Sequence, residues 1–221
     1  MVNYSTSEEN YIKAIFRLQE VHETVSTNAL AQELLTKPAS VTDMMKKLKT
    51  KKLLHYQPYQ GFRLNGEGKK VALGIIRRHR LWEFFLAEKL KFDWDEVHAV
   101  AEELEHVGSK KLIDKLDEYL GYPKFDPHGD PIPDVHGKME DYNRIPLAEL
   151  PVNIYAEVCH VGNQSSEMLE LLRHKNIGIG TKLETKRKFA FDNSIEIKIR
   201  QQAAFTISEQ LAKNIFVKYG S

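Results

Sequence analysis

The sequence predicts a mainly α-helical chain that ends in a small β domain, and three observations lead to this fold class. Apolar residues recur at helical spacing in several segments before residue 120. Residues 121–137 are rich in proline and glycine, which indicates a linker with little regular structure. After residue 147 the pattern changes to short β-prone runs, and Ile195, Ile197 and Ile199 alternate with charged residues as a half-buried strand requires. We therefore expect three domains, at residues 1–72, 73–140 and 147–221.

Three helices and a hairpin are expected in the first domain. A helix capped by Ser5 or Thr6 is followed by a short helix capped by Thr27 or Asn28 and by a basic helix over about residues 39–51. Two short helices joined by a tight turn, the second one basic, are typical of a helix-turn-helix. Two β-prone runs within residues 53–64 flank a turn at 58–61 and predict a hairpin, which makes the unit a winged helix.

The next predicted helix, over about residues 69–90, is apolar almost all round from Ile75 onwards. A surface helix needs a single apolar stripe, so we expect burial against both the core and a partner subunit, and hence a homodimer. A central helix of a monomer is the alternative. Further helices are expected at about 94–107 and 109–120. The last domain has β-prone runs at 152–161, 181–189, 194–200, 203–207 and 214–219 and a short helix at 165–174, which predict a small β-barrel.

Composition points to an ordinary globular protein. The chain has 221 residues, of which 42% are hydrophobic and 29% are charged. No apolar run approaches the roughly 18 residues of a membrane span, and the N-terminal residues lack the basic start and apolar core of a signal peptide. Because Cys159 is the single cysteine, no intrachain disulfide can form, which fits a reducing compartment. We expect a cytoplasmic protein with no membrane partner.

The formal net charge of +1 conceals a strong asymmetry along the chain. Residues 1–80 carry 14 Lys/Arg and 7 Asp/Glu, residues 81–150 carry 8 and 17, and residues 151–221 carry 10 and 7, which gives net charges of +7, −9 and +3. A basic first third suits a polyanion such as double-stranded DNA, and an acidic middle third with several histidines suits a cation. Chance segregation of surface charge is the alternative.

The acidic middle third contains a set of metal-ligand side chains. Four of them fall within roughly 100° of arc on one predicted helix, namely His98, Glu102, Glu105 and His106. His79 and Glu83 share a face of the preceding helix at i and i+4. Imidazole and carboxylate ligands without thiolates suit Mn(II), Fe(II), Co(II) or Zn(II). The alternatives are a solvated acidic helix face and a hydrolytic or di-iron centre, although the paired Glu-x-x-His repeats of di-iron bundles are absent.

Catalysis is not predicted. The sequence has no phosphate-binding glycine loop and no nucleophile beside a base. We therefore expect neither an enzyme nor a site for a small organic substrate. A metal-dependent enzyme with an appended DNA-binding domain is the most distant alternative.

Six short motifs are distributed over nearly the whole chain. They are Glu9-Asn10-Tyr11-Ile12, Pro38-Ala39-Ser40-Val41-Thr42, Arg78-His79-Arg80-Leu81, Val97-His98, Glu102 to Val107 and Gly129-Asp130-Pro131-Ile132-Pro133. Together they resemble the diphtheria toxin repressor and manganese transport regulator family of metal-dependent transcriptional repressors, in its three-domain form. The resemblance implies a winged helix-turn-helix, a helical dimerisation and metal-binding domain, and an SH3-like barrel similar to that of ferrous iron transport accessory proteins.

The resemblance also implies two metal sites. The primary, activating site would comprise Asn10, Glu102, Glu105 and His106. The ancillary site would comprise His79, Glu83 and His98, with Gln164 and Glu167 of the barrel as the nearest matches for its remaining ligands.

Three positions bear on the identity of the metal. Glu102 stands where iron-sensing members of the family have cysteine, which favours manganese. Asn10 and Lys13 stand where manganese-sensing members have an acidic pair. Lys13 cannot coordinate in its charged form, which argues against a binuclear site. We expect Mn(II) rather than Fe(II), with Zn(II) or Co(II) able to substitute.

The implied function is repression by a homodimer that binds operator DNA when loaded with metal and thereby controls genes of metal-ion homeostasis. A metal-independent winged-helix regulator is the alternative. On the recognition helix, Ala39, Ser40 and Asp43 are placed to face base edges, and phosphate contacts are expected from Lys37, Thr42, Lys46 and Lys47. In the predicted wing, Tyr59, Gln60 and Arg63 can reach the DNA backbone or minor groove.

Overall fold

The computed structural model describes residues 4–57, 61–140, 143–200 and 202–220. The chain divides into two compact units. The first comprises Met1–His79, Glu102–Asp114 and Pro133–Lys138, and the second comprises Arg80–Ala101, Lys115–Ile132 and Met139–Ser221. Each unit is therefore assembled from segments that lie far apart in the sequence.

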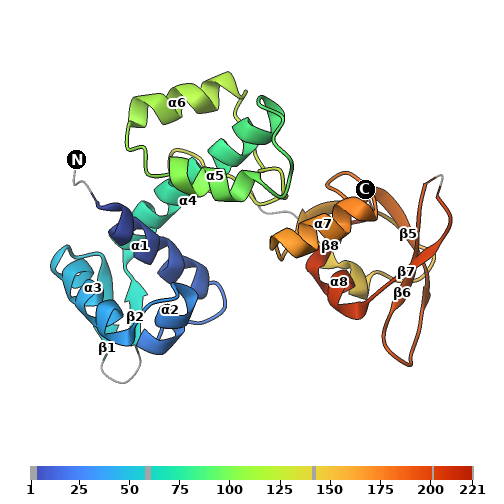
Figure 1. The fold of residues 1–221 in the computed structure, drawn as a ribbon, viewed down its shortest axis with the longest axis horizontal. Helices are drawn as coiled ribbons and strands as arrows, with labels where there is room; N and C mark the ends of the chain where they lie inside the picture. Colours follow the sequence, from blue (N-terminus) through green and yellow to red (C-terminus); the bar gives the residue numbers. More distant parts are fainter. Residues whose placement is uncertain (1–3, 58–60, 141–142, 201, 221) are drawn as a thin grey trace. The chain divides into compact units, whose positions relative to one another are not determined.

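The first unit contains the predicted winged helix, drawn in blue to cyan in Figure 1. Its elements are α1 (Thr6–Leu18), α2 (Thr27–Glu33), α3 (Pro38–Thr50), β1 (Leu54–Gln57) and β2 (Gly61–Leu64). Ser5 and Glu8 form a reciprocal capping box at the start of α1. Ile12, Leu30 and Leu48 are fully buried in one apolar core that fixes the positions of the three helices.

Side-chain caps explain why two helices begin earlier than predicted. Ser26 caps α2, because its hydroxyl accepts a hydrogen bond from the backbone N–H of Ala29. Helix α4 (Gly66–Glu88) begins three residues before the predicted start, and the Asn65 side chain accepts from the N–H of Gly68. Residues 58–60 of the predicted hairpin turn lie outside the described residues.

Two shorter helices, α5 (Val97–Leu104) and α6 (Lys110–Tyr119), lie within the two ranges predicted after α4. Helix α5 ends at Leu104, so Glu105 and His106 lie in a turn and not on the helical face where they were predicted. Arg78 Nε donates to the backbone carbonyl oxygen of Glu105. This contact satisfies a carbonyl close to the helix end, where internal partners are lacking.

The second unit ends in the predicted β domain, drawn from yellow to red in Figure 1. Its strands are β3 (Ile145–Pro146), β4 (Tyr155–Val161), β5 (Lys182–Lys188), β6 (Ile195–Ile199), β7 (Phe205–Ile207) and β8 (Ile215–Lys218). They form one antiparallel sheet in the order β3-β8-β4-β5-β6-β7, accompanied by η1 (Leu147–Glu149), α7 (Ser166–His174) and α8 (Glu209–Asn214). The five longer β runs and α7 match the prediction, whereas β3 and α8 were not predicted.

Residues 121–137 contain no helix or strand, as predicted, but the part that belongs to the second unit is packed and is not a loose linker. Phe125 and Pro131 form an isolated β bridge, and Asp126 between them is buried. Gly129 has a φ of +86°, and a Cβ atom there would lie 2.0 Å from the carbonyl oxygen of Cys159 in β4. Glycine is therefore needed where this turn meets the sheet.

No helix in the described part of the chain combines the length and the apolar character needed to cross a membrane.

Candidate metal centre and nucleic-acid interface

A cluster of buried acidic and imidazole side chains lies in the second unit. Ligand atoms of Glu83 on α4 and of Asp126 and His128 in the turn after α6 lie within 4.8 Å of one another. All three side chains are buried. His98 on α5 joins the cluster through its Nδ1, which is 3.0 Å from Glu83 Oε1. Two carboxylates and two imidazoles are ligand types that first-row divalent metals bind.

His128 is oriented as a ligand by the hydrogen bond on the far side of its ring. Its Nε2 lies 3.1 Å from the backbone carbonyl oxygen of Trp94, so Nε2 carries the proton and Nδ1 presents a lone pair. Nδ1 is buried, makes no hydrogen bond and lies 4.0 Å from Glu83 Oε1. A metal with bonds of about 2.0–2.2 Å fits between two ligand atoms at that separation. Burial lowers the pKa of His128, which keeps the imidazole in its neutral, ligating form.

The carboxylates of this cluster have too few positively charged neighbours to neutralise them. Burial, with the nearby charges of Glu83 and Asp130, raises the pKa of Asp126 well above its usual value. Arg80 lies near both aspartates, with Nε 3.6 Å from Asp126 Oδ2 and Nη2 3.2 Å from Asp130 Oδ1. A divalent cation would supply the charge that these buried carboxylates lack, so the residues present fit a metal ion.

The turn that carries this cluster is bonded to the barrel through Asp130. Gln164 Nε2 donates to Asp130 Oδ2 at 2.6 Å, and His160 Nε2 of β4 is 3.3 Å from Asp130 Oδ1. Burial alone would raise the pKa of Asp130, but hydrogen bonding by His160 and the charge of Arg80 lower it overall. Gln164, a predicted ancillary ligand, thus contacts Asp130, and Glu167 is exposed in the first turn of α7.

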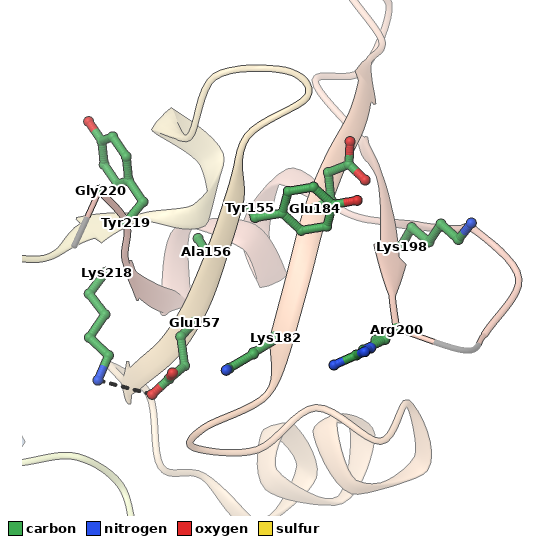
Figure 2. Close-up of a pocket in the computed structure, with 10 residues that line it drawn as sticks. All are labelled: Tyr155, Ala156, Glu157, Lys182, Glu184, Lys198, Arg200, Lys218, Tyr219 and Gly220. Atoms are coloured by element: carbon green, nitrogen blue, oxygen red, sulfur yellow. Dashed lines mark ion pairs between the residues drawn. The ribbon is translucent and has the colours of Figure 1, made fainter.

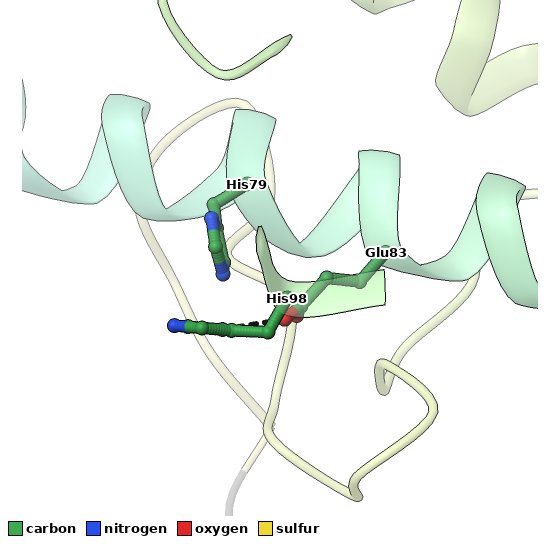
Figure 3. Close-up of side chains that lie close together, drawn as sticks. All are labelled: His79, Glu83 and His98. Atoms are coloured by element: carbon green, nitrogen blue, oxygen red, sulfur yellow. Dashed lines mark hydrogen bonds and ion pairs between the residues drawn. The ribbon is translucent and has the colours of Figure 1, made fainter. Parts of the chain in front are cut away.

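Figure 3 shows the three predicted ancillary ligands that α4 and α5 carry. Glu83 and His98 meet through the 3.0 Å hydrogen bond. His79 lies one helical turn before Glu83 on α4, and its Nδ1 is 2.7 Å from Glu105 Oε2.

Glu105 is the centre of a second buried cluster, which lies in the first unit. Its side chain is 0% exposed. Oε1 lies 2.6 Å from the Lys13 ammonium, and Oε2 lies 2.7 Å from His79 Nδ1. Burial alone would raise the pKa of Glu105, but the hydrogen bond to His79 and the charge of Lys13 lower it overall. Glu105 is therefore an ionised carboxylate with a resident positive partner.

Two other members of the predicted primary set, Glu102 and His106, lie beside Glu105, and His106 Nε2 is 3.6 Å from Glu105 Oε1. Glu102 Oε1 is 3.3 Å from the Lys13 ammonium. His106 Nδ1 is 2.7 Å from Glu9 Oε2, and Asn10 is half-buried on α1. Among the described residues, the groups with three ligand atoms within 4.8 Å include none of the four predicted primary ligands.

Helix α3 presents the predicted DNA-contacting side chains at the surface. The exposed residues are Lys37, Ala39, Ser40, Thr42, Asp43, Lys46 and Lys47, and the buried ones are Val41, Met45 and Leu48. Lys46 Nζ lies 3.1 Å from Asp43, and Lys47 Nζ lies 3.3 Å from Glu8. The α3 surface therefore combines small polar residues with lysines, the composition that a phosphate-contacting helix needs.

The wing is described only in part. Arg63 on β2 is exposed, and its Nη1 lies 3.9 Å from Glu23. Tyr59 and Gln60, which were predicted to reach DNA, lie outside the described residues.

The barrel carries an open groove of about 590 Å³, lined by β4, β5, β6, β8 and the residues that follow the last two strands (Figure 2). Lys218 pairs with Glu157 across the strands at 2.9 Å. Lys182 and Arg200 point toward the same space in Figure 2. None of the lining residues belongs to the predicted metal or DNA sets, so the groove is a separate feature of the barrel.

Asp126 and His128 were not predicted as candidate ligands from the sequence. They stand two residues apart in a proline-rich segment without periodicity, which favoured a linker. The Asp-Pro-His spacing was the available signal. Glu9 was also not predicted as a functional residue. Its Oε1 is 2.6 Å from Arg78 Nη2, and nothing in α1 alone indicates that contact.

Three sequence models of protein families match consecutive parts of the chain. The iron dependent repressor N-terminal DNA binding domain matches residues 3–62. The iron dependent repressor metal binding and dimerisation domain matches residues 65–134. The FeoA domain matches residues 145–219.

Individual relatives and solved structures agree with these matches. The HTH-type transcriptional regulator MntR of Oceanobacillus iheyensis is 35% identical over 120 residues, which are 54% of this chain and 81% of that protein. The iron-dependent repressor IdeR of Mycobacterium tuberculosis is 29% identical over 150 residues, 65% of each protein. A manganese-dependent transcriptional repressor solved in complex with manganese has a TM-score of 0.85 and 30% identity, covering 96% of this chain and 99% of that one. The manganese regulator SloR has a TM-score of 0.75 and 28% identity over the whole of both chains.

Proposed function

The chain belongs to the iron-dependent repressor family, and we propose that it is a metal-dependent transcriptional repressor. It binds operator DNA as a homodimer when a divalent transition metal ion is bound, and it acts in the cytoplasm on genes of metal-ion homeostasis. Its DNA-binding, dimerisation and barrel domains are those proposed above at residues 1–72, 73–140 and 147–221. The relatives named above are transcriptional regulators, which supports this assignment.

The observation that carries the proposal is the buried cluster of Glu83, Asp126 and His128, with His98 beside Glu83. We assign these four side chains as the metal ligands of this chain. Mn(II) is favoured over Fe(II) because the set is rich in carboxylates and holds no thiolate, and Zn(II) or Co(II) can substitute. His79 and Glu167 are retained as further candidate ligands from the resemblance.

Bound metal supplies the positive charge that the buried carboxylates lack. The protein's own part is to hold His128 in the ligating tautomer through the Trp94 carbonyl and to hold Asp126 through the N–H groups of His128 and Asp130. Asp130 links that turn to the barrel, and we assign Gln164 to positioning Asp130. Ordering these contacts raises the fraction of the dimer that is competent to bind DNA, which tightens apparent affinity in proportion.

On the DNA side, we propose that Ala39, Ser40 and Asp43 of α3 face base edges. Phosphate contacts come from Lys37, Thr42, Lys46, Lys47 and, on the wing, Arg63. The exposure of all these side chains supports the assignment. Because lysine contacts to phosphate release counterions, binding should weaken steeply with salt.

The test is fluorescence anisotropy on a DNA duplex selected from a random pool for binding in the presence of Mn(II). We expect binding with Mn(II), loss of binding in EDTA, and loss of the response to Mn(II) in Glu83→Gln. Glu88→Gln, an exposed carboxylate at the end of the same helix, is the matched control and should respond like the unchanged protein. Equal affinity in Mn(II) and in EDTA would instead support the metal-independent winged-helix regulator.

A further inference from the structure

Lys13 occupies the centre of the set of residues that the family resemblance assigns to the primary metal site. The side chain is buried, and its ammonium lies 2.6 Å from Glu105 Oε1 and 3.3 Å from Glu102 Oε1. Lys13 comes from α1, whereas Glu102 and Glu105 come from the end of α5 and the turn after it. One ammonium group therefore ties these two segments together within the first unit.

Other ligand atoms near Lys13 also contact protein groups, and His106 Nε2 lies 3.6 Å from Glu105 Oε1. The second oxygen of Glu105 faces His79 Nδ1 at 2.7 Å. His106 Nδ1 is 2.7 Å from Glu9 Oε2, and the other oxygen of Glu9 is 2.6 Å from Arg78 Nη2. Both oxygens of each of these two glutamates thus have a nitrogen partner. A metal ion would have to displace these partners, beginning with Lys13.

Charge makes that displacement unfavourable. A buried ammonium in contact with two carboxylates cannot share its position with a divalent cation, because like charges at contact distance repel strongly in a medium of low polarity. Moving Lys13 out would break the contacts of its ammonium with Glu102 and Glu105. The residues of the predicted primary site therefore fit a metal ion poorly while Lys13 is in place.

We propose that Lys13 is a built-in replacement for the primary-site metal, so that α1 is tied to the turn after α5 without metal. Each chain then binds its regulatory metal only at the cluster of Glu83, Asp126 and His128. This inference deepens the proposed function and rests on it for the identity of that remaining site. The predicted primary-site residues then have a structural role and do not bind the regulatory metal. They are Asn10, Glu102, Glu105 and His106.

The experiment counts Mn(II) ions per chain by equilibrium dialysis, with electron paramagnetic resonance of the free ion as the second readout. We expect one Mn(II) per full-length chain, and a gain of one in Lys13→Gln, which removes the charge and leaves a polar side chain one atom shorter. Lys13→Arg keeps the positive charge and should not gain an ion. Lys111→Gln, an exposed lysine on α6, controls for the loss of one positive charge and should also show no gain.

The extra ion must also be located. Glu105→Gln in the Lys13→Gln background should remove the gained ion, whereas Glu83→Gln should remove the original one. No gain of Mn(II) in a folded Lys13→Gln protein would overturn the inference, as would two ions in the unchanged protein of which one is lost in Glu105→Gln. The inference is tested by the difference in bound Mn(II) between Lys13→Gln and the unchanged protein. That difference can be measured even if the unchanged protein binds no metal, a result that would contradict the proposed function but not this inference.

Discussion

The two buried carboxylate clusters of this protein differ in the positive charge that each already contains. Around Glu105, the ammonium of Lys13 is in direct contact, and the pKa of Glu105 is lowered despite complete burial. Around Asp126, the nearest guanidinium nitrogen is 3.6 Å away, a second carboxylate lies close by, and the pKa is raised well above its usual value. On the proposed assignment, ligand types alone do not mark a metal site. A metal site also needs a deficit of positive charge.

The largest expected effect comes from a substitution in the cluster around Glu105, where Lys13 supplies the positive charge. Glu105→Ala leaves the buried ammonium of Lys13 without its principal partner, and loss of one member of a buried ion pair costs about 3–5 kcal/mol. Chemical denaturation in EDTA should show this loss. Glu103→Ala, an exposed neighbour, should change stability by less than about 0.5 kcal/mol. A Glu105→Ala protein as stable as the original would show that the pair with Lys13 contributes nothing.

In the cluster around Asp126, removal of a carboxylate charge should not lower stability. Asp126→Asn removes a buried negative charge but can keep the acceptor oxygen that serves the N–H groups of His128 and Asp130. We expect unchanged or higher stability without metal, and an affinity for Mn(II) lower by about 100-fold, since a ligand should matter at least as much as the outer-shell groups whose loss costs 10–100-fold. Isothermal titration calorimetry with Mn(II) measures the affinity, and denaturation in EDTA measures the stability. Marked destabilisation in EDTA would contradict the charge deficit.

Glu8 is a third buried carboxylate and, like Glu105, it already has positively charged partners, which are Lys47 and Lys51. Burial alone would raise its pKa, but hydrogen bonds from Lys51, Ser5 and Lys47 lower it to about 2. Because the folded-state pKa lies below the usual 4.5, ionised Glu8 stabilises the fold above pH about 4.5, and this contribution disappears as pH falls toward about 2. Glu8→Gln should therefore cost about 2 kcal/mol at neutral pH, and less as the solution is acidified. Urea denaturation at several pH values in EDTA measures the difference, and a cost independent of pH would contradict this.

The smallest effect is expected at Asp130, whose backbone N–H donates to Asp126 while its carboxylate contacts Arg80, His160 and Gln164. Asp130→Asn weakens the contacts to Arg80 and His160 and should lower Mn(II) affinity by about tenfold, at the low end of the range for groups that position ligands. Gln164→Ala should have a similar but smaller effect, because it removes one donor to the same carboxylate. Mn(II) titrations of both variants test this order. A loss as large as that of Asp126→Asn would make Asp130 itself a ligand.

Local patterns were sufficient for most of the fold. Helical spacing gave α1 to α6, alternation gave the longer strands, and turn residues gave the hairpin, because each of these signals is contained within a few residues of chain. The errors were also local. Helix α5 ended early, which moved Glu105 and His106 off the predicted helical face, and α8 was too short to carry a clear period.

What the sequence by itself determined is the inventory of the protein: a basic winged helix, an acidic helical region with histidines, and a β-barrel. The family resemblance implied that Glu83 and His98 belong to one site, and the structure places His98 Nδ1 3.0 Å from Glu83 Oε1. Only the tertiary structure decided which charges meet. Lys13 and Glu105 are 92 positions apart, and no periodicity links them. The same holds for Glu83 and His128, which are joined by a turn that looked like a linker. Residues distant in sequence decide whether a buried carboxylate already has a positive partner or lacks one. The reason is that the energy of a buried charge depends on all the charges and dipoles within a few ångströms of it.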